Sequence, residues 1–350
     1  MDTITIFDYV TKTKIPKLIE NNTKSGPNTR SASYSYKDIR QVGHWDLTFE
    51  TIVNDSFAFC LEREVEKRPT STTKPYINNE RTTEMRLESV FWPHVRRVLD
   101  ASFQPNVPRG HVKIFCDVGS SCRRDPRSEP DRAARVSAKI PMEFRLNRLP
   151  GEVKVSWKWS SDMTQTEFRN YEANMEFKQV LSQLLFYMKA HMCRWGYIIT
   201  DKELVCARRQ TGQDNRIEIS EAIPLTRHKQ PLQNWRLGPR VKNCYPEAQG
   251  ELTALLAIWY LHMLASRECL SDGWFLGWGP RPGPTQNIVT PDKSVKVNTG
   301  GLAKRKATPK PITADSSKRK TAGTSGVTTR SRAKESEKTS IPAKRKRKTA

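Results

Sequence analysis

Glu152 and Lys154 stand two positions apart and carry opposite charges, in the run GEVKV that begins at Gly151. The β-branched residues in this run predict a short strand after a turn at Pro150. Side chains alternate along a strand, so the carboxylate and the ammonium share one face and the valines share the other. Such a pair can bind a cation and stabilise an anion, although an isolated Glu-x-Lys is more often a solvated ion pair.

Two earlier carboxylates are candidates for the same site. Glu88 lies near the apolar face of a predicted helix over 81–103, and Asp117 ends a predicted strand over 111–118. Considered alone, the first is typical of a surface glutamate and the second of a turn-capping aspartate.

The strand at Gly151 is followed by a predicted helix from about 167 to 194, because apolar residues recur there at three- and four-residue steps. Gly196 ends this helix. The next two apolar runs, 197–200 and 204–207, predict a hairpin. A strand, a helix and a hairpin in this order need a larger sheet on which to pack.

The chain thus offers, in order, four candidate site elements: a helix with Glu88, a strand ending at Asp117, a strand with Glu152-x-Lys154, and a helix with Gln179 and Gln183. This order resembles the PD-(D/E)XK nuclease superfamily. A closer similarity, to fungal proteins with a PD-(D/E)XK-like domain, is carried by the run EFKQVLSQLLFYMKAHMCRWGYIITDKELVCARR. Gln183 and Tyr187 are similar in spacing to the Gln/Tyr helix motif of RecB-like members.

The resemblance implies an α/β (α+β) fold with a restriction-endonuclease-like αβββαβ core, in which helices flank a mixed central sheet. It implies one or two Mg²⁺ ions held by Glu88, Asp117 and Glu152. Lys154 would orient the attacking water or stabilise the developing negative charge, and Gln183 would help to position the substrate. The expected function is a Mg²⁺-dependent nuclease that hydrolyses phosphodiester bonds of DNA.

An alternative places Lys113, and not Asp117, at the position of the family's aspartate. Asp117 stands 35 residues before Glu152, and no proline precedes it. A lysine cannot hold Mg²⁺. The nuclease-like fold, which the resemblance covers over roughly residues 80–265, would then bind nucleic acid or act as a nuclear scaffold without cleaving.

Five further stretches surround these elements. A helix is predicted over 42–66, and a basic loop that contacts a nucleic-acid backbone over 119–139. A strand is predicted over 140–146 and an edge strand over 217–223. A buried final helix is predicted over 252–264. Pro93 is expected to kink or split the helix over 81–103. Cysteines at 116, 193 and 206 fall in apolar stretches and predict buried side chains.

Composition divides the chain into an N-terminal arm and flexible linker over 1–37, a nuclease-like domain over 38–284, and a disordered basic tail over 285–350. The net charge is +23, and residues 281–350 hold 19 of the 60 Lys and Arg but 4 of the 37 Asp and Glu. Three basic clusters in the tail predict a nuclear import receptor and DNA as partners, and the nucleus as the location.

Other classes of site find no support in the sequence. The seven cysteines are odd in number and contain no CxxC pair, which argues against a zinc module and a disulfide framework. The six histidines form no HxH or HExxH spacing, and neither a phosphate-binding GxxxxGK[ST] loop nor a GxSxG elbow occurs. No signal peptide or membrane-spanning run is recognisable, so we expect an intracellular, reducing compartment.

Overall fold

The computed structural model describes residues 2–21, 27–67, 76–122, 129–136, 139–166, 171–210 and 212–268. They belong to one compact unit. The predicted basic tail over 285–350 lies outside the described residues. The helices of the described part are α1 (Ile6–Lys12), α2 (Phe49–Val53), α3 (Glu80–Val90), α4 (Trp92–Ser102), α5 (Tyr171–Ala190) and α6 (Ala254–Ser266).

Eight strands of the described residues form one mixed sheet in the order β3-β11-β10-β9-β8-β7-β6, with β12 paired to β10. The pairs β8–β9 and β11–β3 are parallel and the other pairs are antiparallel. These strands are β3 (Gln41–His44), β6 (Phe115–Val118), β7 (Arg132–Arg135), β8 (Gly151–Val153), β9 (Trp195–Ile199), β10 (Glu203–Arg208), β11 (Arg216–Ile219) and β12 (Ile223–Pro224). Two small pairs join β1 (Thr3–Thr5) to β4 (Glu64–Glu66) and β2 (Ile19–Glu20) to β5 (Tyr76–Ile77).

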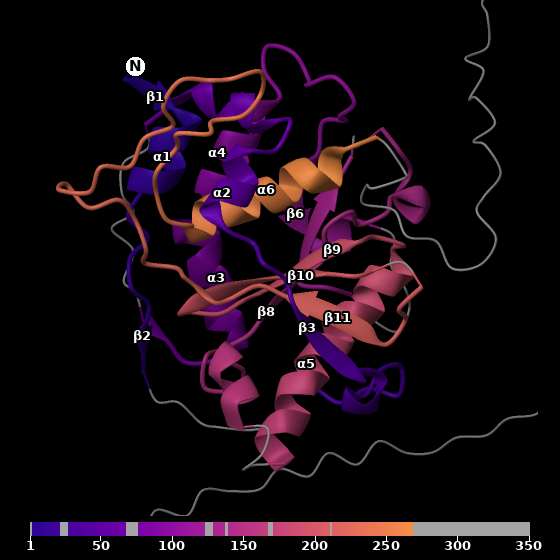
Figure 1. The fold of residues 1–350 in the computed structure, drawn as a ribbon. Helices are drawn as coiled ribbons and strands as arrows, with labels where there is room; N and C mark the ends of the chain where they lie inside the picture. The colour runs from indigo at the N-terminus through magenta and orange to yellow at the C-terminus, as the bar shows by residue number, and fades with distance from the viewer. Residues whose placement is uncertain are drawn as a thin grey trace, which may run out of the picture. The chain divides into compact units, whose positions relative to one another are not determined.

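Helices cover both faces of this sheet. Figure 1 shows α1, α2, α4 and α6 on one side and α5 on the other. The strands alternate accordingly, because Tyr197 and Ile199 of β9 join the core cluster around α4 and α6, whereas Ile198 joins the cluster around α5. A strand that is buried on both faces reads as a continuous apolar run, which explains the sequence pattern at 195–199.

Several predicted elements are confirmed. The helix over 81–103 is split into α3 and α4 at Phe91, because Pro93 lies in the first turn of α4 and cannot donate to the preceding turn. The hairpin after α5 consists of β9 and β10. The edge strand near residue 217 is β11, and the final helix is α6, which is buried on all sides. All three cysteines expected in the core are buried.

Other expectations were wrong. The basic loop over 119–139 contains β7, whose Arg-Ala-Ala-Arg sequence lacks apolar alternation but pairs with β6 and β8 on its two edges. The strand expected over 140–146 is instead a 3₁₀ turn at Met142–Phe144. The helix expected over 42–66 is divided into β3, α2, a 3₁₀ turn and β4.

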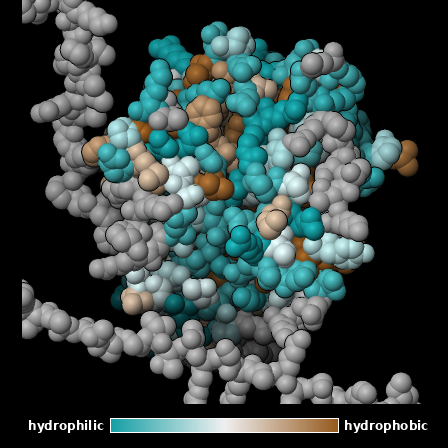
Figure 2. Space-filling view, turned by 180° about the vertical axis from the view of Figure 1, so that it is seen from behind, coloured by the Kyte–Doolittle hydropathy of each residue, from teal (hydrophilic) through white to brown (hydrophobic). Residues whose placement is uncertain are grey.

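The N-terminal arm is part of the body. Strand β1 pairs with β4, and α1 packs against α4 and α6 with five of its seven residues buried. None of the helices in the described part of the chain combines the length and the apolar character that a membrane span requires. The face turned toward the reader in Figure 2 is largely hydrophilic with scattered apolar spots, as expected when the apolar side chains fill the two core clusters.

Candidate active site

The predicted pair, Glu152 of β8 and Lys154 directly after it, forms a buried ion pair. Glu152 and Lys154 are each 2 % exposed. Lys154 Nζ lies 2.6 Å from Glu152 Oε1, which confirms that both side chains leave the strand on one face. This face is the one that α5 covers, whereas Val153 points into the opposite core cluster. The strand therefore presents a carboxylate and an ammonium together inside the protein.

Helix α5 supplies the amide that completes this pair. Gln183 Nε2 donates to Glu152 Oε1 at 2.6 Å and to the Tyr187 hydroxyl at 2.9 Å. Gln183 and Tyr187 are four residues apart, so they lie on one face of the helix. Glu152 Oε2 and Gln183 Oε1 are buried and have no hydrogen-bond partner among the described residues. Two buried oxygens without partners mark a place where a ligand would be favoured.

A second carboxylate, Asp131, reaches the same site. Arg132 of β7 pairs with Gly151 of β8, so the preceding residue, Asp131, comes opposite Glu152. Asp131 Oδ2 accepts the backbone N–H of Val153 at 2.8 Å. Burial raises the pKa of Asp131 to about 6, against the opposing effect of Lys154.

The first turns of α3 add two more acids. Glu80 Oε2 lies 4.0 Å from Lys154 Nζ, and Glu80 Oε1 lies 3.3 Å from Lys158 Nζ. Glu84, one turn further along α3, is close enough to contribute to the raised pKa of Asp131. Three carboxylates, those of Glu152, Glu80 and Asp131, thus act on the Lys154 ammonium, and Glu84 acts on Asp131.

The electrostatics of the site disfavour ionised carboxylates unless a cation is present. Burial and then the charge of Asp131 raise the pKa of Glu152 to about 8, although Lys154 opposes this. Burial lowers the pKa of Lys154, but the carboxylates of Glu152, Glu80 and Asp131 outweigh burial and raise it above its ordinary value. A bound cation reverses such shifts, because it stabilises the ionised acids.

Glu88 does not join this cluster. Its carboxylate forms ion pairs with Arg96 and with Arg132, the latter at 2.9 Å. The Arg132 guanidinium lies 4.3 Å from the Trp92 ring centroid and donates to Cys116 Sγ, so it lies on the face of the sheet opposite Glu152. Glu88 therefore balances a buried guanidinium and is not placed to share a metal with Glu152.

Asp117 is also engaged elsewhere. Its Oδ2 accepts from Arg135 Nε at 2.7 Å, and its Oδ1 accepts its neighbour's backbone N–H at 2.8 Å. Asp117 and Arg135 line a small cavity of about 290 Å³, together with Arg96. Two guanidinium groups beside the carboxylate make this cavity unsuitable for a cation. Lys113, the alternative position, pairs with Asp100 at 3.4 Å on α4.

The sequence did carry a signal for Asp131. Pro130-Asp131 precedes Glu152-Val153-Lys154, so the letters of the PD-(D/E)XK motif stand in the chain in their usual order. We missed them because Asp131 lies within a stretch rich in arginine that predicts a loop. Pro130, which directly precedes Asp131 and has no counterpart before Asp117, was the signal that distinguishes the two aspartates.

The donors at this site are carboxylate and amide oxygens, which suit a hard cation such as Mg²⁺ and not zinc. Within the described residues, no group of three or more His, Cys, Asp or Glu side chains is arranged to hold a metal ion. Mg²⁺ commonly uses one or two protein carboxylates and takes its other ligands from water and substrate phosphate. Asp131 and Glu152 fit that pattern.

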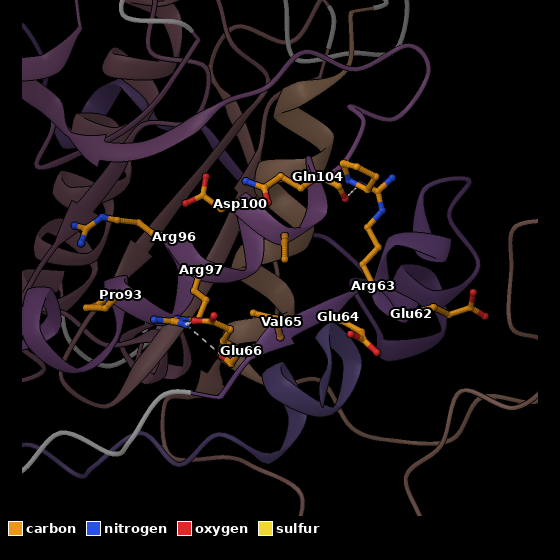
Figure 3. A pocket seen from close by; sticks show the side chains of 12 residues that line it. Glu62, Arg63, Glu64, Val65, Glu66, Pro93, Arg96, Arg97, Asp100 and Gln104 are labelled. Atoms are coloured by element: carbon orange, nitrogen blue, oxygen red, sulfur yellow. Dashed lines mark hydrogen bonds and ion pairs between the residues drawn. The ribbon is translucent and has the colours of Figure 1, made fainter. Parts of the chain in front are cut away.

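The protein also has a larger groove, between β4 and α4, of about 1020 Å³ (Figure 3). Its arginines are already bound within the protein. Arg97 donates to Glu66 Oε2 at 3.0 Å, and Arg63 donates to the Gln104 carbonyl at 3.0 Å. No residue of the Glu152 cluster lines this groove, so we do not assign the chemistry to it.

No family model matches the chain, and no curated protein sequence matches it.

Proposed function

We propose that the protein is a Mg²⁺-dependent nuclease that hydrolyses phosphodiester bonds of DNA, with its active site at Asp131, Glu152, Lys154 and Gln183. One observation carries the proposal: Asp131, directly before β7, and Glu152 of β8 lie together beside a buried ammonium. Asp131 replaces Asp117, and Glu80 or Glu84 replaces Glu88, as the acids contributed by the preceding strand and helix.

The chain's own residues have distinct roles in this proposal. Asp131 and Glu152 would hold Mg²⁺, which supplies a Lewis acid for the phosphate and lowers the pKa of a bound water. Lys154 Nζ places a positive charge where the pentavalent phosphorane gains negative charge. Gln183 holds Glu152 Oε1 and leaves Glu152 Oε2 free to bind the cation.

The fold supports the proposal through the order of its elements. Helices α3 and α4, strands β6, β7 and β8, helix α5 and strand β9 follow one another along the chain. The three strands are an antiparallel meander, and β8 and β9 are parallel neighbours joined through α5. This is the αβββαβ order that the resemblance implies, so we propose a restriction-endonuclease-like core.

The predicted partners remain part of this proposal. The basic clusters of the tail would bind a nuclear import receptor and increase the affinity for DNA without sequence preference. Nuclear localisation follows from the same clusters.

Cleavage of supercoiled plasmid in Mg²⁺ tests the proposal. We expect nicking by the wild type and a loss of at least about 100-fold in Asp131→Asn, since the variant loses a carboxylate that would hold the Mg²⁺ on which charge stabilisation of the phosphate depends. Asp117→Asn is the matched control, because the same change is made at the acid that pairs with Arg135. Equal activity of the wild type and Asp131→Asn would refute the proposed site.

A second candidate function is DNA binding without cleavage. It is favoured by the internal engagement of Glu152, whose Oε1 is shared by Lys154 and Gln183. This alternative predicts salt-dependent DNA binding by the wild type with no Mg²⁺-dependent nicking.

A further inference from the structure

Residues 27–38, which the sequence predicts as part of a flexible linker, form a strap across α5. Gln179 is 2 % exposed, and both ends of its amide bind this strap. Its Nε2 donates to the Thr29 carbonyl at 3.1 Å, and its Oε1 accepts the backbone N–H of Tyr36 at 3.0 Å. Glu176, one turn earlier, accepts a further backbone N–H of the strap at 2.7 Å.

The strap carries Tyr34 to the candidate active site. The side chain is 6 % exposed, and its ring centroid lies 5.8 Å from that of Phe186 on α5. Phe186 contacts Tyr187 at 6.1 Å, and Tyr187 bonds to Gln183 within the site. Burial raises the pKa of Tyr34, and the charge of Glu152 raises it further, so the phenol keeps its proton.

The Tyr34 hydroxyl forms no hydrogen bond with another described residue, although Glu152, Lys154 and Asp131 are close enough to affect its pKa. A protonated phenol in such surroundings is a hydrogen-bond donor without a protein acceptor. Among the described residues, the fully buried polar atoms without a partner do not include this hydroxyl, so water or a ligand can reach it and accept its hydrogen bond. The natural acceptor beside a cation site is an anionic oxygen.

We propose that Tyr34 is a substrate-contacting residue, whose hydroxyl donates a hydrogen bond to a phosphate oxygen of nucleic acid bound at the Asp131–Glu152 site. The strap, residues 27–38, holds the ring in place. This inference rests on the proposed function, because it takes a phosphodiester as the ligand.

The test compares Tyr34→Phe with Tyr36→Phe in the full chain. Tyr34→Phe removes the hydroxyl and keeps the ring against Phe186, while the control removes the same atom from the strap two positions away. Binding of a short labelled DNA duplex is measured by fluorescence anisotropy with Ca²⁺, at a salt concentration that weakens the tail's contribution. Cleavage rates with Mg²⁺ and the melting temperature are measured in parallel.

We expect Tyr34→Phe to weaken duplex binding about tenfold, the usual effect of losing one hydrogen bond to a charged group, with an unchanged melting temperature. Tyr36→Phe should bind as the wild type does. Equal affinities of the wild type and Tyr34→Phe would overturn the inference. If the wild type fails to cleave, the nuclease proposal fails, and the affinities still decide whether Tyr34 contacts the phosphate.

Discussion

Replacing Asp131 by Asn should change how stability depends on pH, by an amount that follows from its surroundings. In the folded chain the pKa of Asp131 is about 6, whereas its ordinary value is 3.8. The folded form therefore keeps its proton over a range in which the unfolded chain releases it. The stability that the protonated Asp131 carboxyl contributes is fully present below pH 3.8 and is lost as the pH rises to about 6.

The two pKa values correspond to a loss of about 3 kcal/mol, since one pH unit is worth 1.36 kcal/mol. Asparagine stays neutral and still offers an oxygen to the Val153 N–H. The difference in unfolding free energy between the wild type and Asp131→Asn should therefore shift by about 2–3 kcal/mol, in favour of the variant, between pH 4 and pH 7. Urea denaturation in EDTA measures this difference, and acids that do not interact with Asp131 cancel in the comparison.

Asp117→Asn is a control, because it should change the pH dependence of stability in the opposite direction. Burial raises the pKa of Asp117, but the hydrogen bond and charge of Arg135 outweigh burial and lower it. Asp117 thus stabilises the fold above its ordinary pKa of 3.8, and this stability is lost as the pH falls. If Asp131→Asn follows the wild type at every pH, Asp131 is not in the buried, acid-rich site described above.

Two further substitutions test the packing and the charge of the site. Gly151→Ala should destabilise the fold by about 1–3 kcal/mol, because a Cβ there would lie 2.1 Å from the Tyr197 ring. Thermal unfolding measures the destabilisation, and an unchanged melting temperature would contradict the close approach. Lys154→Met should lower the free energy of unfolding by about 3–5 kcal/mol, measured by urea denaturation at pH 8, because it leaves Glu152 without its cationic partner. Adding Glu152→Gln should recover part of this loss, and no recovery would mean that the two side chains are not a pair.

Local patterns in the sequence predicted much of the fold and half of the residues that meet at the candidate site. Alternation at 151–155 gave the shared face of Glu152 and Lys154, the apolar stripe predicted α5, and the family resemblance supplied Gln183. The residues around β8 and the helix α5 contain enough apolar residues for the strand and helix periods to be recognised in the sequence. The split between α3 and α4 followed from the chemistry of a single proline.

The remaining half depended on pairing between distant segments. Strand β7 has no apolar period, and its ladders to β6 and β8 fix it as a strand. The position of β7 decides which aspartate faces Glu152, so the missed strand led to the choice of Asp117. The strap over 27–38 was missed for a similar reason, since its polar composition indicates a linker and its hydrogen bonds to Gln179 are long-range.

Titration of Mn²⁺, followed by electron paramagnetic resonance of the free ion, tests most directly whether Asp131 and Glu152 share a divalent cation. The account predicts that the wild type and Asp117→Asn bind with similar affinity, and that Asp131→Asn and Glu152→Gln each bind at least about tenfold more weakly. Unchanged binding in Asp131→Asn, or a loss of binding in Asp117→Asn, would contradict it.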